Sequence, residues 1–469
     1  MKQDPARLWR EAIGLYDRGQ YEAAGRLLTV LRELRPEHPP LQHLLAMCRY
    51  NAGEITQATD DIQSLVNKYP ELTLAKIDLA TILGEQGRQP EALAMLQTAY
   101  RETPQDLSLG LNLCIAYGQA SDWDKADRLS RDLIARRPDP ELIWMRTILA
   151  LNFGHFEEGW RSYGIRWRLP PHAWNSQRYD LGLIPAAPGV IPSKPFWLWT
   201  EQGIGDELLL ASVLPEALAA GMTFVFGCNS RNISLYKRRF PDLDIRDATR
   251  VRRDDLAGIQ IQMPLADLTA LMRPSRAAFP NPAPPGYLTA DSALRGRLRQ
   301  RYLQDRPSGE KLVGIAWHSG SAARGKQKST LLEDWLPILR QPGITFVSLQ
   351  YGQNQAALQA MQERHGIRIL QDASINPMGP SDPVAAQITA MDAVVTVSNT
   401  AAHFAGALGV PTIVMLPAGY GLHWYWQRDA AQSIWYGNVT LLRQQKTPHW
   451  QPVLAEAAER LQQILPNSR

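Results

Sequence analysis

The chain has 469 residues, of which 45% are hydrophobic, and a formal net charge of only +4 at pH 7. This length favours about three domains, and so small a net charge gives no argument for a nucleic-acid partner. The sequence shows neither an N-terminal apolar segment nor an apolar run of about 18 residues, so we expect neither export nor a membrane span. The three cysteines are scattered along the chain, which favours a cytoplasmic protein without disulfides or a metal site.

Small and turn-forming residues recur with a period of about 34 residues in the first third of the chain. Four sets of positions share this period: Pro36, Pro70, Pro104 and Pro138; Gly19, Gly53, Gly87 and Ser121; Ala24, Ala58, Ala92 and Ala126; Ala12, Ala46, Ala80 and Cys114. Glycine or serine would end the first helix of each unit, and proline would end the second. The pattern predicts tetratricopeptide repeats, whose arrays form concave surfaces that hold other proteins.

An altered fifth unit follows the four regular ones. Its residues in phase with the repeat are Trp144, Leu151, His155 and Trp160. We expect residues 1–168 to form an all-α array with this fifth unit as its cap. Six prolines occur between positions 170 and 195, and they predict an irregular linker over 169–194.

A second proline-rich stretch, 279–286, divides the rest of the chain into two parts. Each part alternates short apolar runs, typical of buried strands, with helical patterns. This alternation predicts a parallel sheet covered by helices. We therefore expect a multidomain protein, with α/β domains over 195–285 and 286–447 and a last helix within 448–469.

In the first α/β part, a predicted strand runs into the segment 201–207, which contains Gly203, Gly205 and Asp206. The helix after it is expected from about Leu208. The two glycines would let the backbone turn at the carboxyl edge of the sheet, where ligands of open α/β sheets bind. The carboxylate of Asp206 has two interpretations at this stage: it either offsets the dipole of the helix or takes part in catalysis.

In the second α/β part, a polar and cationic loop, 318–329, follows the first predicted strand and would suit a phosphate-bearing ligand through His318 and Lys328. Gln350, at the end of the next strand, would either reach a nucleotide or simply terminate the strand. A later strand runs into a helix start whose exposed N–H groups would form an anion site. The residues assigned to that helix start are Asn399, Thr400, Ala401 and His403, the last being either a phosphate contact or a packed structural histidine.

Residues 195–452 resemble the glycosyltransferase family nine superfamily, the heptosyltransferase-like enzymes. The resemblance is greatest to the bacterial branch in which this module follows tetratricopeptide repeats. It is carried by the segments 199–207, 314–317, 348–350 and 398–409, together with aromatic regions at 423–426 and 435–436. Trp424 and Trp426 would then line a cleft and stack on a sugar.

The resemblance implies a GT-B fold, in which two Rossmann-like domains face each other across a cleft. The first domain would take the acceptor, the second would take the nucleotide sugar without a metal ion or cofactor, and the last helix would cross back toward the first domain. Asp206 would remove the proton of the acceptor hydroxyl, and the sugar would be transferred with inversion. The residues assigned to the nucleotide sugar are Gly203, Gly205, His318, Lys328, Gln350, Asn399, Thr400, Ala401 and His403.

One residue departs from the family pattern. The strand before the phosphate helix usually ends in aspartate followed by threonine, but here it ends in Asn399 and Thr400. Two functions remain open from the sequence. The first is a glycosyltransferase that acts on a protein hydroxyl captured by the repeat array. The second is a repeat-containing adaptor or chaperone whose transferase domain is degenerate, and Asn399 is its main support.

Overall fold

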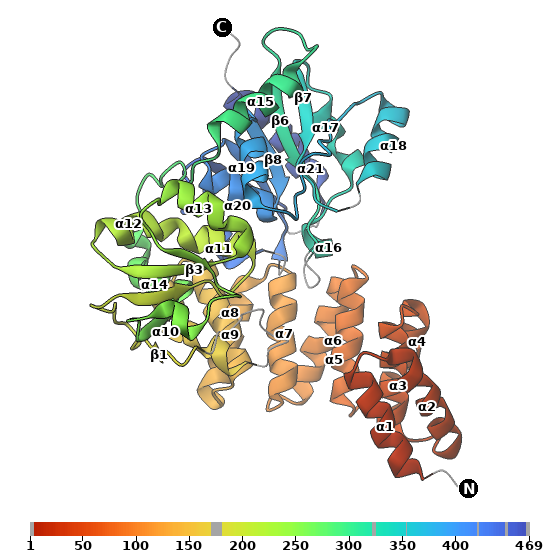
Figure 1. The fold of residues 1–469 in the computed structure, drawn as a ribbon. Coiled ribbons are helices and arrows are strands. Elements are labelled where there is room, and N and C mark those ends of the chain that lie inside the picture. Colours follow the sequence, from red (N-terminus) through yellow and green to blue (C-terminus); the bar gives the residue numbers. More distant parts are fainter. Residues whose placement is uncertain are drawn as a thin grey trace. The chain divides into compact units, whose positions relative to one another are not determined.

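The computed structural model describes residues 4–169, 181–320, 325–352, 354–419, 422–445 and 449–465. The chain forms two compact units, Met1–Pro138 and Asp139–Arg469 (Figure 1). In the described residues, the first unit is helical and the second contains two parallel β-sheets. The predicted combination of a helical repeat array with α/β domains is therefore confirmed.

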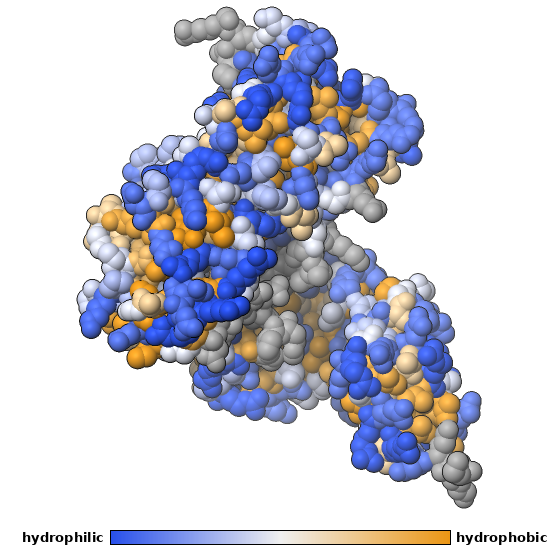
Figure 2. Space-filling model, viewed as in Figure 1, coloured by the Kyte–Doolittle hydropathy of each residue, from blue (hydrophilic) through white to orange (hydrophobic). Residues whose placement is uncertain are grey.

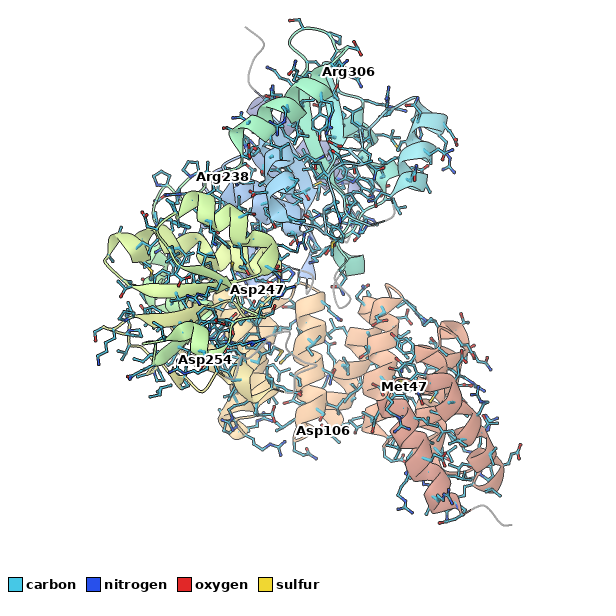
Figure 3. The ribbon with its side chains drawn as sticks, in the orientation of Figure 1. Met47, Asp106, Arg238, Asp247, Asp254 and Arg306 are labelled. Carbon is cyan, nitrogen blue, oxygen red and sulfur yellow. The ribbon has the colours of Figure 1, made fainter. Side chains whose placement is uncertain are left out.

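The first unit consists of four helical hairpins. The helices pair as α1 (Pro5–Asp17) with α2 (Tyr21–Leu34), α3 (Pro39–Asn51) with α4 (Ile55–Lys68), α5 (Thr73–Glu85) with α6 (Gln89–Glu102), and α7 (Leu107–Gln119) with α8 (Trp123–Arg136). Side chains cap some of these helices, and Asp106, labelled in Figure 3, accepts hydrogen bonds from the backbone N–H groups of Ser108 and Leu109 at the start of α7. Each hairpin begins about 34 residues after the previous one, as tetratricopeptide repeats do.

The turn inside each hairpin uses a left-handed backbone. The residues in this conformation are Gly19 (φ 74°), Gly53 (φ 91°), Gly87 (φ 82°) and Ser121 (φ 58°). Glycine adopts it without steric cost, which is why the periodic small residue predicts where the first helix ends. The four periodic prolines each follow the C-cap residue of the second helix.

Ser121 is the one periodic turn residue that is not glycine, so it gives a direct test of this account. The Ser121→Gly variant is expected to stabilise α7 and α8 by about 0.5–1 kcal/mol, because it removes the steric cost of a side chain at positive φ. The same change at Ser108, inside α7, should instead destabilise the helix by up to about 1 kcal/mol. Hydrogen exchange of the amides in α7 and α8 measures both effects, and equal shifts in the two variants would contradict the account.

The helices of this unit pack through their small residues. Ala12, Ala24, Ala46 and Ala58 are at most 1% exposed. Cys114 occupies a buried repeat position, as predicted, and burial raises the pKa of its thiol. The unit also leaves apolar side chains exposed, and Figure 2 shows orange atoms at its surface. These side chains are Ile13, Val30, Leu34 and Leu74.

The second unit begins with a fifth hairpin, α9 (Pro140–Asn152) and α10 (Phe156–Ser162), followed by a 3-10 helix, Tyr163–Arg168. The sequence predicted this hairpin as the cap of the array, within 1–168, but it belongs to the compact unit that contains the sheets. Its contacts explain the difference. Trp160 Nε1 donates to the carbonyl of Arg273 at 2.8 Å, and Gln427 Nε2 donates to the carbonyl of Leu151 at 2.7 Å.

The first sheet has the parallel strand order β1-β5-β2-β3-β4. Its strands are β1 (Ile184–Pro185), β2 (Phe196–Trp199), β3 (Phe224–Cys228), β4 (Ile245–Asp247) and β5 (Ile261–Pro264). The helices of this lobe are α11 (Ile204–Leu210), α12 (Leu214–Ala219), α13 (Ile233–Arg239) and α14 (Leu265–Met272). The chain leaves β2 toward β3 and β4, and later returns to the other side of β2 as β5. We call residues 181–285 the first lobe.

The second sheet has the parallel order β10-β9-β8-β6-β7. Its strands are β6 (Lys311–Ala316), β7 (Ile344–Ser348), β8 (Ala393–Val397), β9 (Thr412–Leu416) and β10 (Val439–Arg443). The helices are α15 (Ser292–Leu303), α16 (Gly325–Lys328), α17 (Leu336–Leu339), α18 (Gln355–His365), α19 (Ser381–Thr389), α20 (Thr400–Ala407) and α21 (Gln451–Ile464). The central strands β8 and β9 are wholly buried, as expected when both faces of a parallel sheet are covered. We call residues 286–465 the second lobe.

Helix α21 packs on the second sheet, against β8, β9, β10 and α17. The resemblance implied that the last helix crosses back toward the first domain, but the apolar side of α21 is used within the second lobe. Val453, Leu454, Ala457 and Leu461 are at most 3% exposed and belong to the apolar cluster on one face of this sheet. A second and larger cluster joins the fifth hairpin, the first lobe and the other face of the second sheet, which explains why these parts form one unit.

Candidate functional site

The second sheet reverses its order at β6, because β7 lies on one side of β6 and β8 on the other. Ligands of open α/β sheets bind at the carboxyl ends of the strands beside such a point. The loop after β6 begins with Trp317 and His318, and α20 begins directly after β8. His318 and Asn399, two of the predicted site residues, therefore meet at this point. The middle of the predicted phosphate loop, 321–324, lies outside the described residues.

Gln350 holds the loop after β6 in place. Its Oε1 accepts from the backbone N–H groups of Trp317 and His318, both at 2.9 Å, and its Nε2 donates to the carbonyls of His318 and Tyr351, both at 3.2 Å. The side chain is 3% exposed. All four hydrogen bonds of this amide are thus made inside the protein, which favours a structural role over the predicted contact with a nucleotide.

Asn399 caps α20 and ties it to the same loop. Its Oδ1 accepts from Ala401 N at 3.0 Å and from Thr396 Oγ1 at 3.1 Å. Its Nδ2 donates to the carbonyl of His318 at 3.3 Å. Asparagine can make these contacts because it carries both a donor and an acceptor. Of the amides assigned to phosphate, that of Ala401 is therefore already bonded within the cap, whereas Thr400 and Ala401 remain partly exposed as residues.

The contacts of Asn399 predict the effect of restoring the aspartate that the related family usually has. The Asn399→Asp variant should lose about 1–3 kcal/mol of unfolding free energy, because its carboxylate would face the carbonyl of His318 without a proton to donate. Urea denaturation followed by tryptophan fluorescence measures this loss. The exposed Asn376, which accepts from Met378 N through Oδ1, is the control, because an Asn376→Asp carboxylate accepts equally well. Equal stability of the two variants would contradict this explanation.

Helix α11 of the first lobe packs against α20 of the second. It begins at Ile204, earlier than the expected start at Leu208, so Gly205 and Asp206 lie in its first turn. A Cβ atom on Gly205 would lie 2.9 Å from Cδ2 of His403. Gly205 is therefore required for the close approach of the two helices, and not only for a turn in the backbone.

His403 lies at the centre of a buried aromatic cluster. Its Nε2 is 3.3 Å from the hydroxyl of Tyr425 and its Nδ1 is 3.4 Å from that of Tyr436. Its ring stacks on Trp426 with a centroid distance of 5.1 Å. Burial, with a smaller contribution from the positive charge of Lys328, lowers the pKa of His403 to about 3. The imidazole is therefore neutral at pH 7, which supports the structural interpretation of this residue.

Lys328 places a positive charge in this region. It is 4% exposed, and its Nζ lies 3.1 Å from Nε2 of His423. Since an ammonium group is only a donor, His423 accepts this hydrogen bond as a neutral imidazole. The ring of His423 stacks on Tyr425 at a centroid distance of 5.1 Å. Lys328 and the start of α20 thus lie around the same histidine and tyrosine side chains.

Asp206 lies between two carboxylates that are fixed in the protein. Glu201 pairs with Arg166 through Oε2–Nε at 3.0 Å and Oε1–Nη2 at 3.1 Å. Glu207 accepts from Asn229 N at 2.9 Å and Asn232 Nδ2 at 2.7 Å. Both are at most 3% exposed, whereas Asp206 is partly exposed. Burial is the main cause that raises the pKa of Glu201, to about 7, and that of Glu207.

Asp206 also influences groups on both sides of it. Its negative charge contributes to the raised pKa values of Tyr163, in the fifth hairpin segment, and of Tyr436, in the second lobe, although burial is the larger cause in both. Among the carboxylates of the segment 201–207, Asp206 is thus the one that remains partly exposed. This environment suits a group that exchanges a proton with a ligand.

The structure brings most of the predicted residues together. Gly205 contacts His403, the charge of Lys328 acts on His403, and Asn399 bonds to the His318 backbone. Gly203 precedes α11, near Oδ2 of Asp206. The sequence did not assign a role to His423, Tyr425 or Tyr436, although it marked 423–426 as aromatic-rich.

Arg166 was also missed, because it was counted as part of the repeat array. Trp424 and Trp426 were expected to line a cleft, but they are buried at 8% and 0% exposure. Trp426 Nε1 donates to Ser398 Oγ at 2.9 Å. These two tryptophans therefore belong to the core.

Among the described residues, no helix combines the length and apolar character that a membrane span requires. Within the same residues, no group of three or more histidine, cysteine, aspartate or glutamate side chains is arranged to hold a metal ion.

No family model matches the chain. A curated relative, Protein FlbA of Caulobacter vibrioides, is 25% identical over 461 residues, which cover 94% of this chain and 75% of FlbA. Among solved structures, TTC0263, a thermophilic TPR protein of Thermus thermophilus, is 23% identical and covers 36% of this chain and 92% of its own, with a TM-score of 0.32. A tetratricopeptide repeat protein of Parabacteroides merdae is 16% identical and covers 34% of this chain and 64% of its own, with a TM-score of 0.29.

Proposed function

We propose that the second unit is a glycosyltransferase of GT-B type, which transfers a sugar from a nucleotide-sugar donor to an acceptor hydroxyl with inversion. One observation carries this proposal. The helices that follow β2 and β8, one from each parallel sheet, pack together through Gly205 and His403. Asp206 of the first lobe and the start of α20 in the second lobe are thereby brought to the same region.

The chemistry of the transfer assigns a role to each charged group. The acceptor oxygen bonds to the anomeric carbon while Asp206 takes its proton, and the bond from that carbon to the nucleoside diphosphate breaks. Negative charge then develops on the leaving diphosphate. Lys328 and the N-terminal end of α20 would stabilise that charge. The neutral His403 would not donate a proton from an imidazolium form, because its pKa is about 3.

The repeat unit supports a protein as the acceptor. Arrays of tetratricopeptide repeats commonly hold protein segments, and this one leaves Ile13 and Leu74, both large and apolar, at 36% and 55% exposure. We propose that the array captures the acceptor protein whose hydroxyl group receives the sugar.

Binding of nucleotides tests the proposal. A panel of uridine, guanosine, adenosine and cytidine diphosphates should include one that raises the melting temperature of the full chain, since a ligand at 100 times its Kd adds about 2.7 kcal/mol. The Lys328→Met variant should bind that diphosphate at least about tenfold more weakly, because it loses a charged hydrogen-bond donor. Lys194→Met, at an exposed position, is the control and should bind as the wild type does. Unchanged affinity in Lys328→Met would remove Lys328 from the site.

A second function is favoured by one observation. The side chains of Gln350 and Asn399 are committed to internal hydrogen bonds, as they would be in an adaptor whose transferase-like part has lost its donor site. If no diphosphate of the panel stabilises the chain, the adaptor function is favoured and the transferase is excluded.

A further inference from the structure

A cavity of about 1110 Å³ lies on the first lobe, at the carboxyl ends of three neighbouring strands. Pro185, Pro264 and Trp199, the last residues of β1, β5 and β2, line it. Its other walls come from α10, the 3-10 helix after α10, and α14. We infer that this cavity binds a saccharide.

The position of the cavity is that of a ligand site. The first sheet reverses its order at β2, with β3 on one side and β5 on the other. The crevice at the carboxyl ends of such strands is where open α/β sheets bind ligands. The volume is at the upper end of the range of about 300–1,000 Å³ that ligand pockets usually have. It is therefore large enough for more than one sugar ring.

Aromatic side chains form much of the wall. Those that line the cavity are Trp160, Tyr163, Trp167 and Trp199. The guanidinium of the buried Arg166 lies 4.7 Å from the ring centroid of Tyr163 and 4.4 Å from that of Trp167. These contacts hold both rings in place, so little conformational entropy is lost when a ligand binds. The flat C–H faces of pyranose rings pack well on such rings.

Polar side chains complete the wall. Asp267 lines the cavity, and one of its oxygens, Oδ1, accepts from Arg166 Nη2 at 2.7 Å. The side chain of Asp267 is nevertheless 44% exposed, so the carboxylate can accept further hydrogen bonds. Gln262 and Arg161 also line the cavity. A ligand with apolar ring faces and many hydroxyl groups matches both kinds of wall, and saccharides have this chemistry.

Two other ligand classes match the wall less well. An aliphatic chain would cover Asp267 and take its carboxylate out of water without a new hydrogen bond, which is costly. A nucleotide would stack on the rings but would bring its phosphate close to the same carboxylate. Both classes are used below as competing probes.

The saccharide site is separate from the donor site proposed above. Tyr163 connects the two, because it lines the cavity and its hydroxyl accepts from Gln202 Nε2 at 3.1 Å, in the segment that also contains Asp206. Saccharide binding is measured without any donor. The outcome is therefore independent of whether sugar transfer takes place.

The experiment uses the full chain on a printed array of mono- and oligosaccharides, followed by saturation-transfer NMR with the saccharides that bind. Uridine monophosphate and octanoate are the competing probes. We expect at least one saccharide to bind and both competing probes to give no signal. The inference is overturned if no saccharide binds, or if octanoate or uridine monophosphate binds in place of the saccharides.

Variants assign the bound saccharide to the cavity. Trp167→Ala removes a wall, and Ala187→Trp adds bulk at an exposed lining residue, where it should not disturb folding. Each is expected to weaken saccharide binding at least tenfold. Trp450→Ala, on the second lobe, is the matched control and should change it less than twofold. Unchanged binding in the correctly folded Ala187→Trp variant would overturn the assignment.

Discussion

The Asp206→Asn variant is expected to lose turnover by a factor of about 10²–10⁴, the usual contribution of a general base. Asparagine has nearly the same shape as aspartate but cannot take a proton at neutral pH. The diphosphate identified by the panel should bind with nearly unchanged affinity, because Asp206 lies on the first lobe and the proposed phosphate contacts lie on the second. Release of nucleoside diphosphate during hydrolysis of the donor sugar measures the turnover, with water in place of the acceptor.

The matched control for Asp206 is Asp254, an exposed carboxylate of the same lobe that is labelled in Figure 3. Asp254→Asn should hydrolyse the donor at the wild-type rate. If Asp206→Asn retains that rate as well, Asp206 is not the base. If Asp206→Asn instead loses both turnover and nucleotide affinity, its carboxylate serves the structure of α11 and not proton transfer.

The Arg166→Met variant is expected to destabilise the second unit by about 3–5 kcal/mol, since it removes one partner of a buried ion pair. Both side chains of the Arg166–Glu201 pair have 0% exposure. Methionine replaces the volume but leaves the Glu201 carboxylate without a counter-charge. Urea denaturation of the full chain followed by tryptophan fluorescence measures the loss.

The loss in Arg166→Met should depend on pH. Burial already raises the pKa of Glu201 to about 7, and removing Arg166 raises it further. A carboxyl with a raised pKa binds its proton more tightly in the folded state, so its contribution to stability falls as the pH rises above its unfolded value of about 4.3. The difference between the wild type and the variant should therefore be larger at pH 8 than at pH 5.

Two further variants separate the charge from the packing. Arg166→Met combined with Glu201→Gln should recover part of the lost stability at pH 8, because no buried charge is left uncompensated. Arg364→Met breaks a surface pair with Glu333, whose side chains are 65% and 47% exposed, and should cost less than about 1 kcal/mol. A loss in Arg166→Met as small as that in Arg364→Met, or one independent of pH, would contradict the account.

Local chemistry was the reliable part of the sequence-based prediction. The ends of the repeat helices were predicted because left-handed glycine and helix-terminating proline act within a few residues of themselves. The buried strands of both sheets were predicted from their apolar runs. The capping role of Asn399 was predicted for the same reason, since a cap needs only the first turn of its own helix.

The predictions that failed concern which partner a segment packs against. The fifth hairpin resembles the repeats before it, but Trp160 and Leu151 bond to residues 273 and 427, and no periodic pattern can indicate these. Helix α21 has an apolar side that would fit either lobe. The position of Gln350 at the end of a strand suggested a ligand contact, but its four internal hydrogen bonds depend on a loop about 30 residues away in the chain.

The sequence by itself determined the helical repeats, the two α/β parts and the residue types available for chemistry, because each depends on short-range periodicity and backbone preference. Only the tertiary structure decided that Gly205 meets His403, that Arg166 neutralises Glu201 and that four aromatic rings surround a cavity at β2. These arrangements join segments that are far apart in the chain. They depend on how side chains of particular shape and charge exclude water from one another, and a linear order of residues does not encode such contacts locally.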